Sequence, residues 1–224
     1  MAQNENGIET TNRILAVSRE LFYEEGYNAT TFADIAAKAR VNKSAIHYHF
    51  KSKENLLKSI YSGSIQKNNL TAERYFTKNT IPLAKYLFSG IIYNYKVFTD
   101  EKYRRFIIDS QVLFRGENLN ETVLGMARIL FRNDSDFLIL TDAKFHDLLA
   151  IMGYTNSLAS YIDANMSSCS LTSINHYVEE EHRKILQIGE SEYKLAREQL
   201  AELELRCEWS KLDTTLRPDI LLQL

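Results

Sequence analysis

The chain has 224 residues, of which 45% are hydrophobic and 25% are charged, and its net charge is −2 at pH 7. These values are typical of a globular protein, and nothing in the overall charge indicates a nucleic-acid or membrane partner. With only two prolines and eight glycines, helix breakers are scarce, so the composition favours an all-α fold.

The N-terminus is polar, and the longest uncharged run in the centre of the chain, residues 148–162, is shorter than the roughly 20 residues that span a bilayer. We therefore expect no membrane contact and a cytoplasmic location. Cys169 and Cys207 have no metal-type spacing, and we expect two reduced thiols.

A first helix is expected to begin at Thr10 or Thr11, which can cap it, after a frayed arm of residues 1–9. Apolar residues then recur at helical spacing as far as Phe22, and Gly26 suits the left-handed position beyond a helix end.

Two short helices and the start of a longer one are expected in residues 31–57. Thr31-x-x-Asp34 fits a capping pattern for the second helix, Asn42 can cap a third helix over 43–50, and Ser52 can cap the fourth. The predicted inward residues of this unit are Ile35, Ala36, Ile46 and Phe50.

The charge of the chain is uneven, because six cations and one anion lie between Lys38 and Lys58, a local net charge of +5. A basic patch on an acidic protein is the electrostatic footprint of a DNA-binding unit. A helix-turn-helix places the first residues of its second helix against base edges in the major groove. Lys43, Ser44 and Ala45 occupy those positions.

Further contacts are expected around this helix. His47 and Tyr48, one turn on, can reach phosphates or bases. Thr31 and Lys53 lie near helix starts, where free amides and the helix dipole favour phosphate.

Residues from about Thr10 to Ile60 resemble the DNA-binding domain of tetracycline-repressor (TetR) family regulators. The matching residues are Thr31-x-x-x-Ile35-Ala36, Val41, the run Ile46-His47-Tyr48-His49-Phe50-Lys51-Ser52-Lys53-Glu54 and Leu56. The resemblance implies DNA contacts by Lys43, Ser44, His47, Tyr48, His49 and Lys53. Two residues depart from the family pattern. His47 stands where tyrosine is usual, and Arg40 stands where glycine is usual, which predicts a strained positive φ and a phosphate contact by Arg40.

Helices are expected in the remaining chain from Pro82, from Asp100 to about Arg115, over 121–132, 137–166 and 171–208, with turns at 116–120 and near 167–169. Six aromatic residues crowd the first two of these helices: Tyr86, Tyr93, Phe98, Tyr103, Phe106 and Phe114. Each is either an ordinary core residue or part of the wall of a ligand site.

Metal chemistry has little support. His47 and His49, two residues apart, do not share a helix face. Glu179-x-x-His182 is half of a di-iron bundle motif, but no second pair exists, so a solvent-facing acidic turn is the favoured interpretation. We expect no metal, no cofactor and no catalytic site.

We therefore predict an all-α protein with a three-helix helix-turn-helix domain over residues 1–57 and a larger helical bundle over residues 58–224 for ligand binding and dimerisation. The resemblance implies a homodimer on a palindromic operator in double-stranded DNA, which represses transcription and is released by an unidentified small-molecule effector. The two last long helices are the expected dimer surface, with a face of Leu148, Leu149, Met152, Leu158, Ala159 and Ile162 on the first. Two other classes stay open, a protein-binding helical scaffold and a metal-containing helical-bundle enzyme.

Overall fold

The structure, a computed structural model, describes residues 2–115 and 142–216. The described residues form helices and no strand, which confirms the all-α prediction. In chain order the elements are α1 (Ala2–Glu24), α2 (Phe32–Ala39), α3 (Lys43–Phe50), α4 (Lys53–Glu73), α5 (Pro82–Thr99), α6 (Glu101–Asp109), the 3₁₀ turn η1 (Ser110–Phe114), α8 (Asp142–Asn165), α9 (Leu171–Ile185), α10 (Glu190–Arg206) and the 3₁₀ turn η4 (Trp209–Lys211).

The start of α1 differs from the prediction. The helix begins at Ala2, so residues 2–9 are helical rather than a frayed arm, and neither threonine caps it. Instead, the Thr10 and Thr11 hydroxyls donate to the carbonyls of Asn6 and Gly7 one turn earlier. Hydroxyls that bond back onto their own helix are satisfied in its interior and need no helix end.

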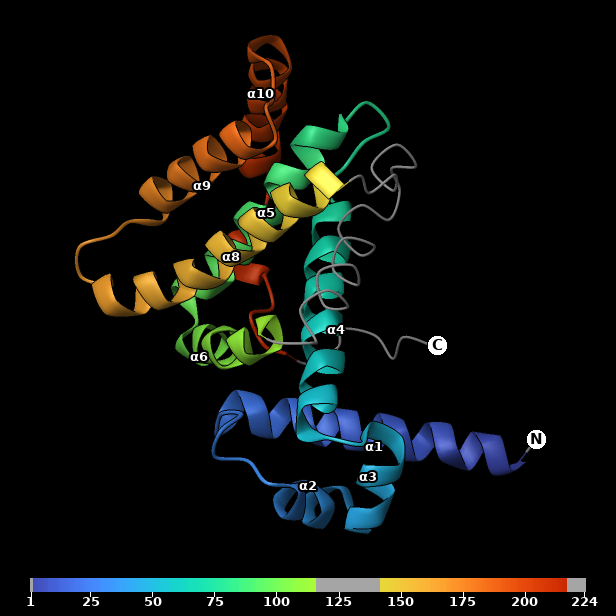
Figure 1. Cartoon of the computed structure of the whole chain (residues 1–224). Coiled ribbons are helices and arrows are strands. Elements are labelled where there is room, and N and C mark those ends of the chain that lie inside the picture. Colours follow the sequence, from blue (N-terminus) through green and yellow to red (C-terminus); the bar gives the residue numbers. More distant parts are fainter. Residues whose placement is uncertain (1, 116–141, 217–224) are drawn as a thin grey trace.

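Helices α1, α2 and α3 form one unit at one end of the molecule, and α4 rises from it into the rest of the chain (Figure 1). The predicted inward residues Ile35, Ala36, Ile46 and Phe50 are all buried. The Ser52 side chain caps α4 by accepting from the backbone N–H of Asn55, as predicted. Because α4 is continuous, the domain boundary predicted at residue 57 falls inside this helix.

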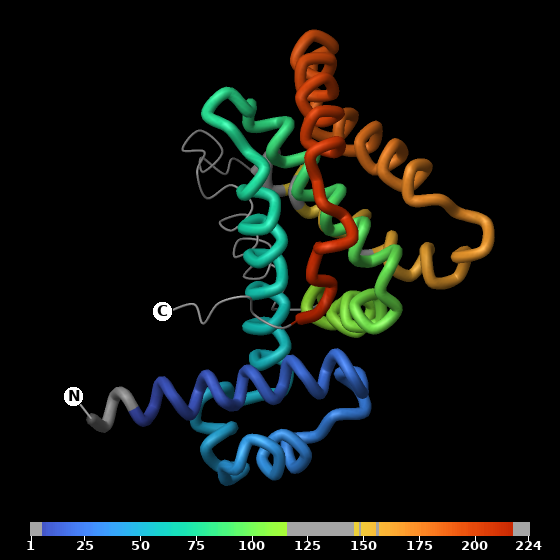
Figure 2. The backbone as a smooth tube through the Cα atoms, turned by 180° about the vertical axis from the view of Figure 1, so that it is seen from behind, coloured from blue at the N-terminus to red at the C-terminus, as the bar shows by residue number. Residues whose placement is uncertain are grey.

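Helix α5 is the central element of the larger part, since it packs against α4, α6, α8, α9 and α10. Its Pro82 occupies the first helical turn, where a missing N–H costs nothing. On one side, Phe88 and Leu87 pack with Leu200 of α10 and with Trp209. The chain after α10 runs back along the body to α4 (Figure 2), where Lys67 pairs with Asp213 at 2.5 Å.

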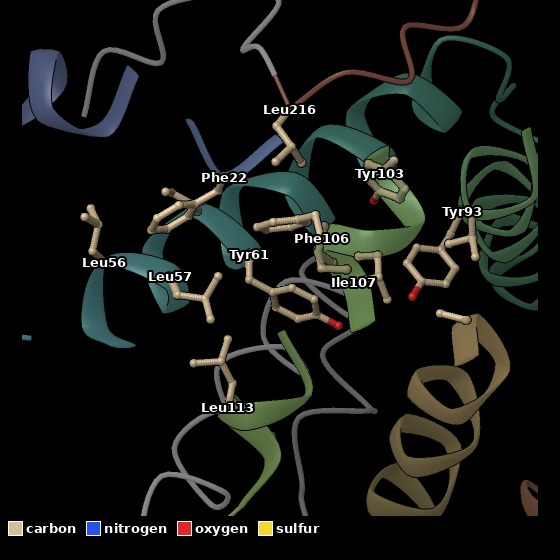
Figure 3. Close-up of a cluster of buried hydrophobic side chains, with 14 of the residues drawn as sticks. Phe22, Leu56, Leu57, Tyr61, Tyr93, Tyr103, Phe106, Ile107, Leu113 and Leu216 are labelled. Atoms are coloured by element: carbon tan, nitrogen blue, oxygen red, sulfur yellow. The ribbon is translucent and has the colours of Figure 1, made fainter. Parts of the chain in front are cut away.

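A second cluster of buried side chains joins the two parts of the chain (Figure 3). It contains Phe22 of α1, Leu56, Leu57 and Tyr61 of α4, and Tyr103, Phe106 and Ile107 of α6. Fully burying one such aliphatic or aromatic side chain is worth about 1.5–3 kcal/mol, so this cluster fixes α6 against the α1–α4 unit.

Two expected helices fall differently in the structure, and others lie partly or wholly outside the described residues. The helix expected to reach Arg115 ends at Asp109 and continues as the 3₁₀ turn η1. Residues 137–141, the turn expected at 116–120 and the helix expected over 121–132 lie outside the described residues. The single helix predicted over 171–208 is wrong, because residues 186–189 separate α9 from α10 and Gln187 has a φ of 52°.

The face of α8 that we expected to form the dimer surface lies inward. Met152, Leu158, Ala159 and Ile162 are at most 7% exposed and belong to the cluster shared with α6 and α9. A side chain buried within its own chain cannot meet a second copy, so this part of the prediction was wrong.

Cys169 and Cys207 are free thiols, as expected. Among the described helices, none combines the length and the apolar character needed to cross a bilayer.

Candidate functional site

Helix α3 has one buried face and one exposed face. Ile46 is fully buried and Phe50 is 8% exposed, whereas Lys43, Ser44 and His47 are exposed and Tyr48 is 74% exposed. Tyr48 lies on this exposed face together with a cation, since Lys51 Nζ is 5.6 Å from the centroid of its ring. Ala45 lies between the two faces and is half-buried.

Both histidines of α3 have fixed positions. The His47 ring packs edge-on against Phe32 with 4.8 Å between ring centroids, and its Nδ1 lies 3.3 Å from the Lys51 carbonyl oxygen. His49 Nδ1 lies 3.0 Å from the Thr11 hydroxyl of α1. These contacts tie α3 to α1 and α2, so that its outer face is presented by a rigid unit.

Arg40 ends α2 in the left-handed conformation, with a φ of 54° and a ψ of 48°. Its N–H points to the carbonyls of Ala36 and Ala37, which closes the helix, and its side chain is exposed beside the start of α3. The positive φ expected at this residue is confirmed, and the phosphate contact stays a prediction.

Replacing Arg40 with glycine should raise the free energy of unfolding by about 1 kcal/mol, because glycine adopts this conformation without a Cβ clash. The same change should weaken DNA binding if the guanidinium touches phosphate. Chemical denaturation and a binding titration on the same variant measure the two effects separately. A variant that is less stable than the parent would contradict the strain assigned to Arg40.

The Thr31 side chain is already engaged at the start of α2. Its hydroxyl donates to Asp34 Oδ2 at 2.6 Å, and the Asp34 N–H points back to Thr31 Oγ1 at 3.3 Å, which completes the predicted capping box. Hydrogen bonds from Thr31 lower the pKa of Asp34 below its usual value. The Thr31 hydroxyl is therefore already bonded to the Asp34 carboxylate, and a DNA phosphate would compete with that carboxylate for it.

Lys53 begins α4 with its ammonium 4.2 Å from the centroid of the Tyr27 ring. Partial burial lowers the pKa of Lys53 from its usual value. The ring attracts the cation and limits its motion, so the charge is held at the edge of the α1–α4 unit. Lys43 begins α3, Lys51 directly follows α3 and Lys53 begins α4, and these three lysines contribute positive charge to this end of the molecule.

A cavity of about 90 Å³ lies between α4, α5, α8 and α9, in the larger part of the chain. Of the six aromatic residues proposed as core or ligand wall, Tyr86 and Tyr93 line it. Tyr103 and Phe106 are fully buried in the cluster of Figure 3, and Phe98 and Phe114 pack against that cluster. The structure therefore does not place these last four in the cavity wall.

The Glu179/His182 pair also lines this cavity, so the expected solvent-facing turn is wrong. Glu179 is 3% exposed and accepts a 2.7 Å hydrogen bond from Arg197 Nη1 of α10, while His182 is 7% exposed with its Nδ1 2.9 Å from the Tyr86 hydroxyl. Burial lowers the pKa of His182 to about 4 and raises that of Glu179, which the Arg197 cation partly offsets.

Sequence reasoning missed other lining residues, including Asn68 and Asn175. A helical projection could have found part of this set, because Asn175, Val178 and His182 recur three and four residues apart on one face of α9. In the described ranges, no group of three or more His, Cys, Asp or Glu side chains could hold a metal ion. The metal-enzyme alternative relied on Glu179 and His182 as metal ligands. The Glu179 carboxylate already forms an ion pair with Arg197, so this support is lost.

Comparison with known proteins identifies relatives of the N-terminal unit. Residues 14–60 match the family model described as "Bacterial regulatory proteins, tetR family". The chain is 47% identical over 49 residues to the HTH-type transcriptional regulator QacR of Staphylococcus aureus. This aligned segment is 22% of this chain and 26% of that protein. It is 35% identical over 78 residues to the Transposon Tn10 TetC protein of Escherichia coli, covering 35% of this chain and 38% of that protein.

A solved structure is also similar in outline. The crystal structure of NalD, the secondary repressor of the MexAB-OprM multidrug efflux pump in Pseudomonas aeruginosa, aligns over 80% of this chain and 96% of that chain, with 20% identity and a TM-score of 0.46. The chain spans 26% and 38% of the lengths of the two curated relatives that it matches.

Proposed function

We propose that this chain, which belongs to the tetR family of bacterial regulatory proteins, is a sequence-specific DNA-binding transcriptional repressor that responds to a small molecule. The observation that carries the proposal is the two-faced helix α3. Its inner face is fixed by Ile46 and Phe50, and its outer face presents Lys43, Ser44 and Tyr48 at the end of a rigid three-helix unit. A helix presented in this way fits the major groove of B-DNA.

In the proposed complex, Lys43, Ser44 and Ala45 meet base edges, and Tyr48 meets bases or the backbone. The groups proposed for phosphate are Thr31, Arg40, His47, His49 and Lys53. His49 is half-buried, and its Nδ1 contacts the Thr11 hydroxyl, so its proposed role includes positioning α3.

The proposed active form is a homodimer on a palindrome, with the two α3 helices about 34–36 Å apart so that they enter successive major grooves. Since the inward face of α8 is unavailable, we assign the dimer contact to the outward faces of α8 and α9. Gly153, Ser157, Tyr161 and Ala164 follow one another at helical spacing on exposed α8, and Tyr177 of α9 is 58% exposed. Small residues beside exposed tyrosines allow two helix pairs to approach closely.

Helix α6 offers a physical link between the cavity and the DNA-binding unit. Its Tyr103 hydroxyl accepts from Asn68 Nδ2, at the cavity wall, at 3.2 Å. On the other side of α6, Arg105 donates to the carbonyl of Tyr23 at 2.7 Å, and Asp109 accepts from the backbone N–H of Tyr27 at 3.0 Å. Suppose that a ligand binds more tightly when α6 has a different position. Because α6 is bonded to the α1–α3 unit, that ligand would change the orientation of this unit and therefore its affinity for DNA.

Two lysine substitutions test the division of roles on DNA taken from upstream of the protein's own gene, where we place the operator. Replacing Lys53 with alanine should weaken binding to every sequence and reduce the slope of log affinity against log salt by about one, because one phosphate contact is lost. Replacing Lys43 should change the preferred base sequence and cost about 1–3 kcal/mol on the operator.

Titrations at several salt concentrations on operator and random duplexes separate the two effects. Lys194, exposed on α10 at the end of the molecule opposite α1–α3 (Figure 1), supplies the matched control, and Lys194→Ala should change neither quantity. If Lys53→Ala and Lys43→Ala changed the salt slope and the sequence preference identically, the proposed division into phosphate and base contacts would be wrong.

A further inference from the structure

The cavity wall contains unpartnered polar atoms. Among the described residues, the buried side-chain atoms without a hydrogen-bond partner are Asn68 Oδ1, the Tyr93 hydroxyl and His182 Nε2, and all three residues line this one cavity. Their residues are 3%, 6% and 7% exposed. A buried polar atom without a partner costs about 1–3 kcal/mol, so three such atoms around one space indicate groups kept for a bound molecule.

The residues that carry the unpartnered atoms are linked to two positions on α5 that lie two helical turns apart. Tyr86, which contacts His182, and Tyr93 are seven residues apart on α5. Seven residues are two helical turns, or about 10 Å along the axis. Asn68 and Tyr93 both contact Tyr103, the former by a hydrogen bond and the latter ring to ring (Figure 3). We name these the Tyr93 end and the His182 end.

The space between the ends is apolar and open. Gly90 lies on α5 between Tyr86 and Tyr93, and a Cβ added to it would meet no atom within 4 Å. The surrounding wall includes Ile65, Leu87, Ile151 and Met152. This cavity, at about 90 Å³, is smaller than the dry cavity of about 150 Å³ that binds benzene, but it is partly open rather than enclosed, so a slender molecule with one ring can fill it and extend beyond it.

The chemistry of each end selects the complementary group. Asn68 Oδ1 can only accept, so the ligand must donate at the Tyr93 end, while the Tyr93 hydroxyl can donate back. His182 Nε2 donates if Nδ1 accepts from the Tyr86 hydroxyl, and accepts in the other tautomer. A hydroxyl group satisfies both ends, since it can donate and accept.

The charge of the wall disfavours an ionic ligand. None of the described residues that line the cavity is a lysine or arginine, so these residues offer a carboxylate no counter-ion. Glu179, the one carboxylate among the described lining residues, already pairs with Arg197, so an ammonium group would have to compete with that pair. Burying an unpaired charge costs far more than burying a hydrogen-bonded hydroxyl.

We propose that this cavity binds an uncharged, slender molecule with an apolar ring-sized middle and a hydroxyl-type donor at each end, one held by Asn68 and Tyr93 and the other by His182. The inference rests on the proposed effector-binding role of this part of the chain. It adds the chemical class of the effector and the groups that select it.

A matched series of probes tests the class by calorimetric titration of the full-length protein. The probes are para-hydroxyphenylpropanol, which is uncharged with two polar ends, para-propylphenol with one, and the charged para-hydroxyphenylpropanoate and para-hydroxyphenylpropylamine. We expect the propanol to bind about tenfold tighter than propylphenol and at least about thirtyfold tighter than either ion. Equal or tighter binding of either ion, or no binding of the propanol, would overturn the proposal.

Two pairs of variants locate the site. Tyr93→Phe removes one hydroxyl and should weaken the propanol about tenfold, whereas Tyr95→Phe, the same change on the same helix beside Trp209, should not. Gly90→Ala should fill the middle of the cavity and weaken the propanol, and Gly7→Ala on α1, where a Cβ also meets no atom within 4 Å, should not. Equal effects within either pair would place the probe elsewhere and reject this site.

DNA binding of the same protein is measured separately. Propanol binding without any DNA binding would reject the proposed regulatory function and keep the ligand class. DNA binding without propanol binding would reject the ligand class and keep the function.

Discussion

Replacing Ile46 with alanine should lower the free energy of unfolding by about 2–5 kcal/mol, whereas replacing Tyr48 with alanine, two residues further along α3, should change it by no more than about 0.5 kcal/mol. Ile46 is fully buried against the α1–α4 core, so its truncation leaves a cavity. Tyr48 is 74% exposed, and its removal leaves no cavity.

The order of the effects should reverse on DNA. Tyr48→Ala should weaken operator binding about tenfold or more at a temperature where the variant is fully folded, because the side chain lies on the proposed contact face. Urea denaturation and an operator titration on both variants measure the two quantities. A Tyr48→Ala protein that is stable and binds DNA like the parent would show that the outer face of α3 does not meet DNA.

Acid should destabilise the protein through His182. The unfolded histidine takes up a proton near pH 6.5, whereas burial keeps the folded pKa at about 4 despite the favourable charge of Glu181. Stability is therefore fully present above pH 6.5 and is lost as the pH falls toward 4. Between pH 7.5 and pH 5 this one group should remove about 2 kcal/mol. The rings of Tyr86 and Tyr154 pack against the imidazole and give the proton no anionic partner.

His182→Gln removes this titration, so the variant should lose about 2 kcal/mol less than the parent between the two pH values. All other groups titrate in both proteins and cancel in the difference. Exposed His176 on the same helix is the matched control, and His176→Gln should behave like the parent. The account of His182 as a buried neutral group fails if parent and His182→Gln lose the same stability in urea titrations at the two pH values.

The N-terminal unit could be predicted from the sequence because its signals are local. Thr31 and Asp34 form the capping box three residues apart, and Ile46 and Phe50 share one face of a two-turn helix. The strained Arg40 followed from the resemblance to a pattern with glycine at that position. Each of these features is decided by neighbours within a few residues.

The larger part depends on contacts between distant residues, which the sequence does not reveal. Glu179 is buried because Arg197, eighteen residues later on another helix, neutralises it. The break between α9 and α10 has no proline, and Gln187 rather than a glycine adopts the positive φ. The start of α10 does have a local signal, since Gly189 is its N-cap residue and Glu190 and Glu192 lie in its first turn. The packing of α10 against α5 is a contact between distant residues that the sequence does not reveal.

The most direct test of sequence-specific binding is quantitative competition footprinting of the full-length protein on DNA from upstream of its own gene. The proposed function predicts two protected half-sites about 10 base pairs apart, centre to centre, and an affinity at least about a thousandfold higher than for random duplex of equal length at the same salt. Equal affinity for operator and random DNA, without a protected site, would contradict it.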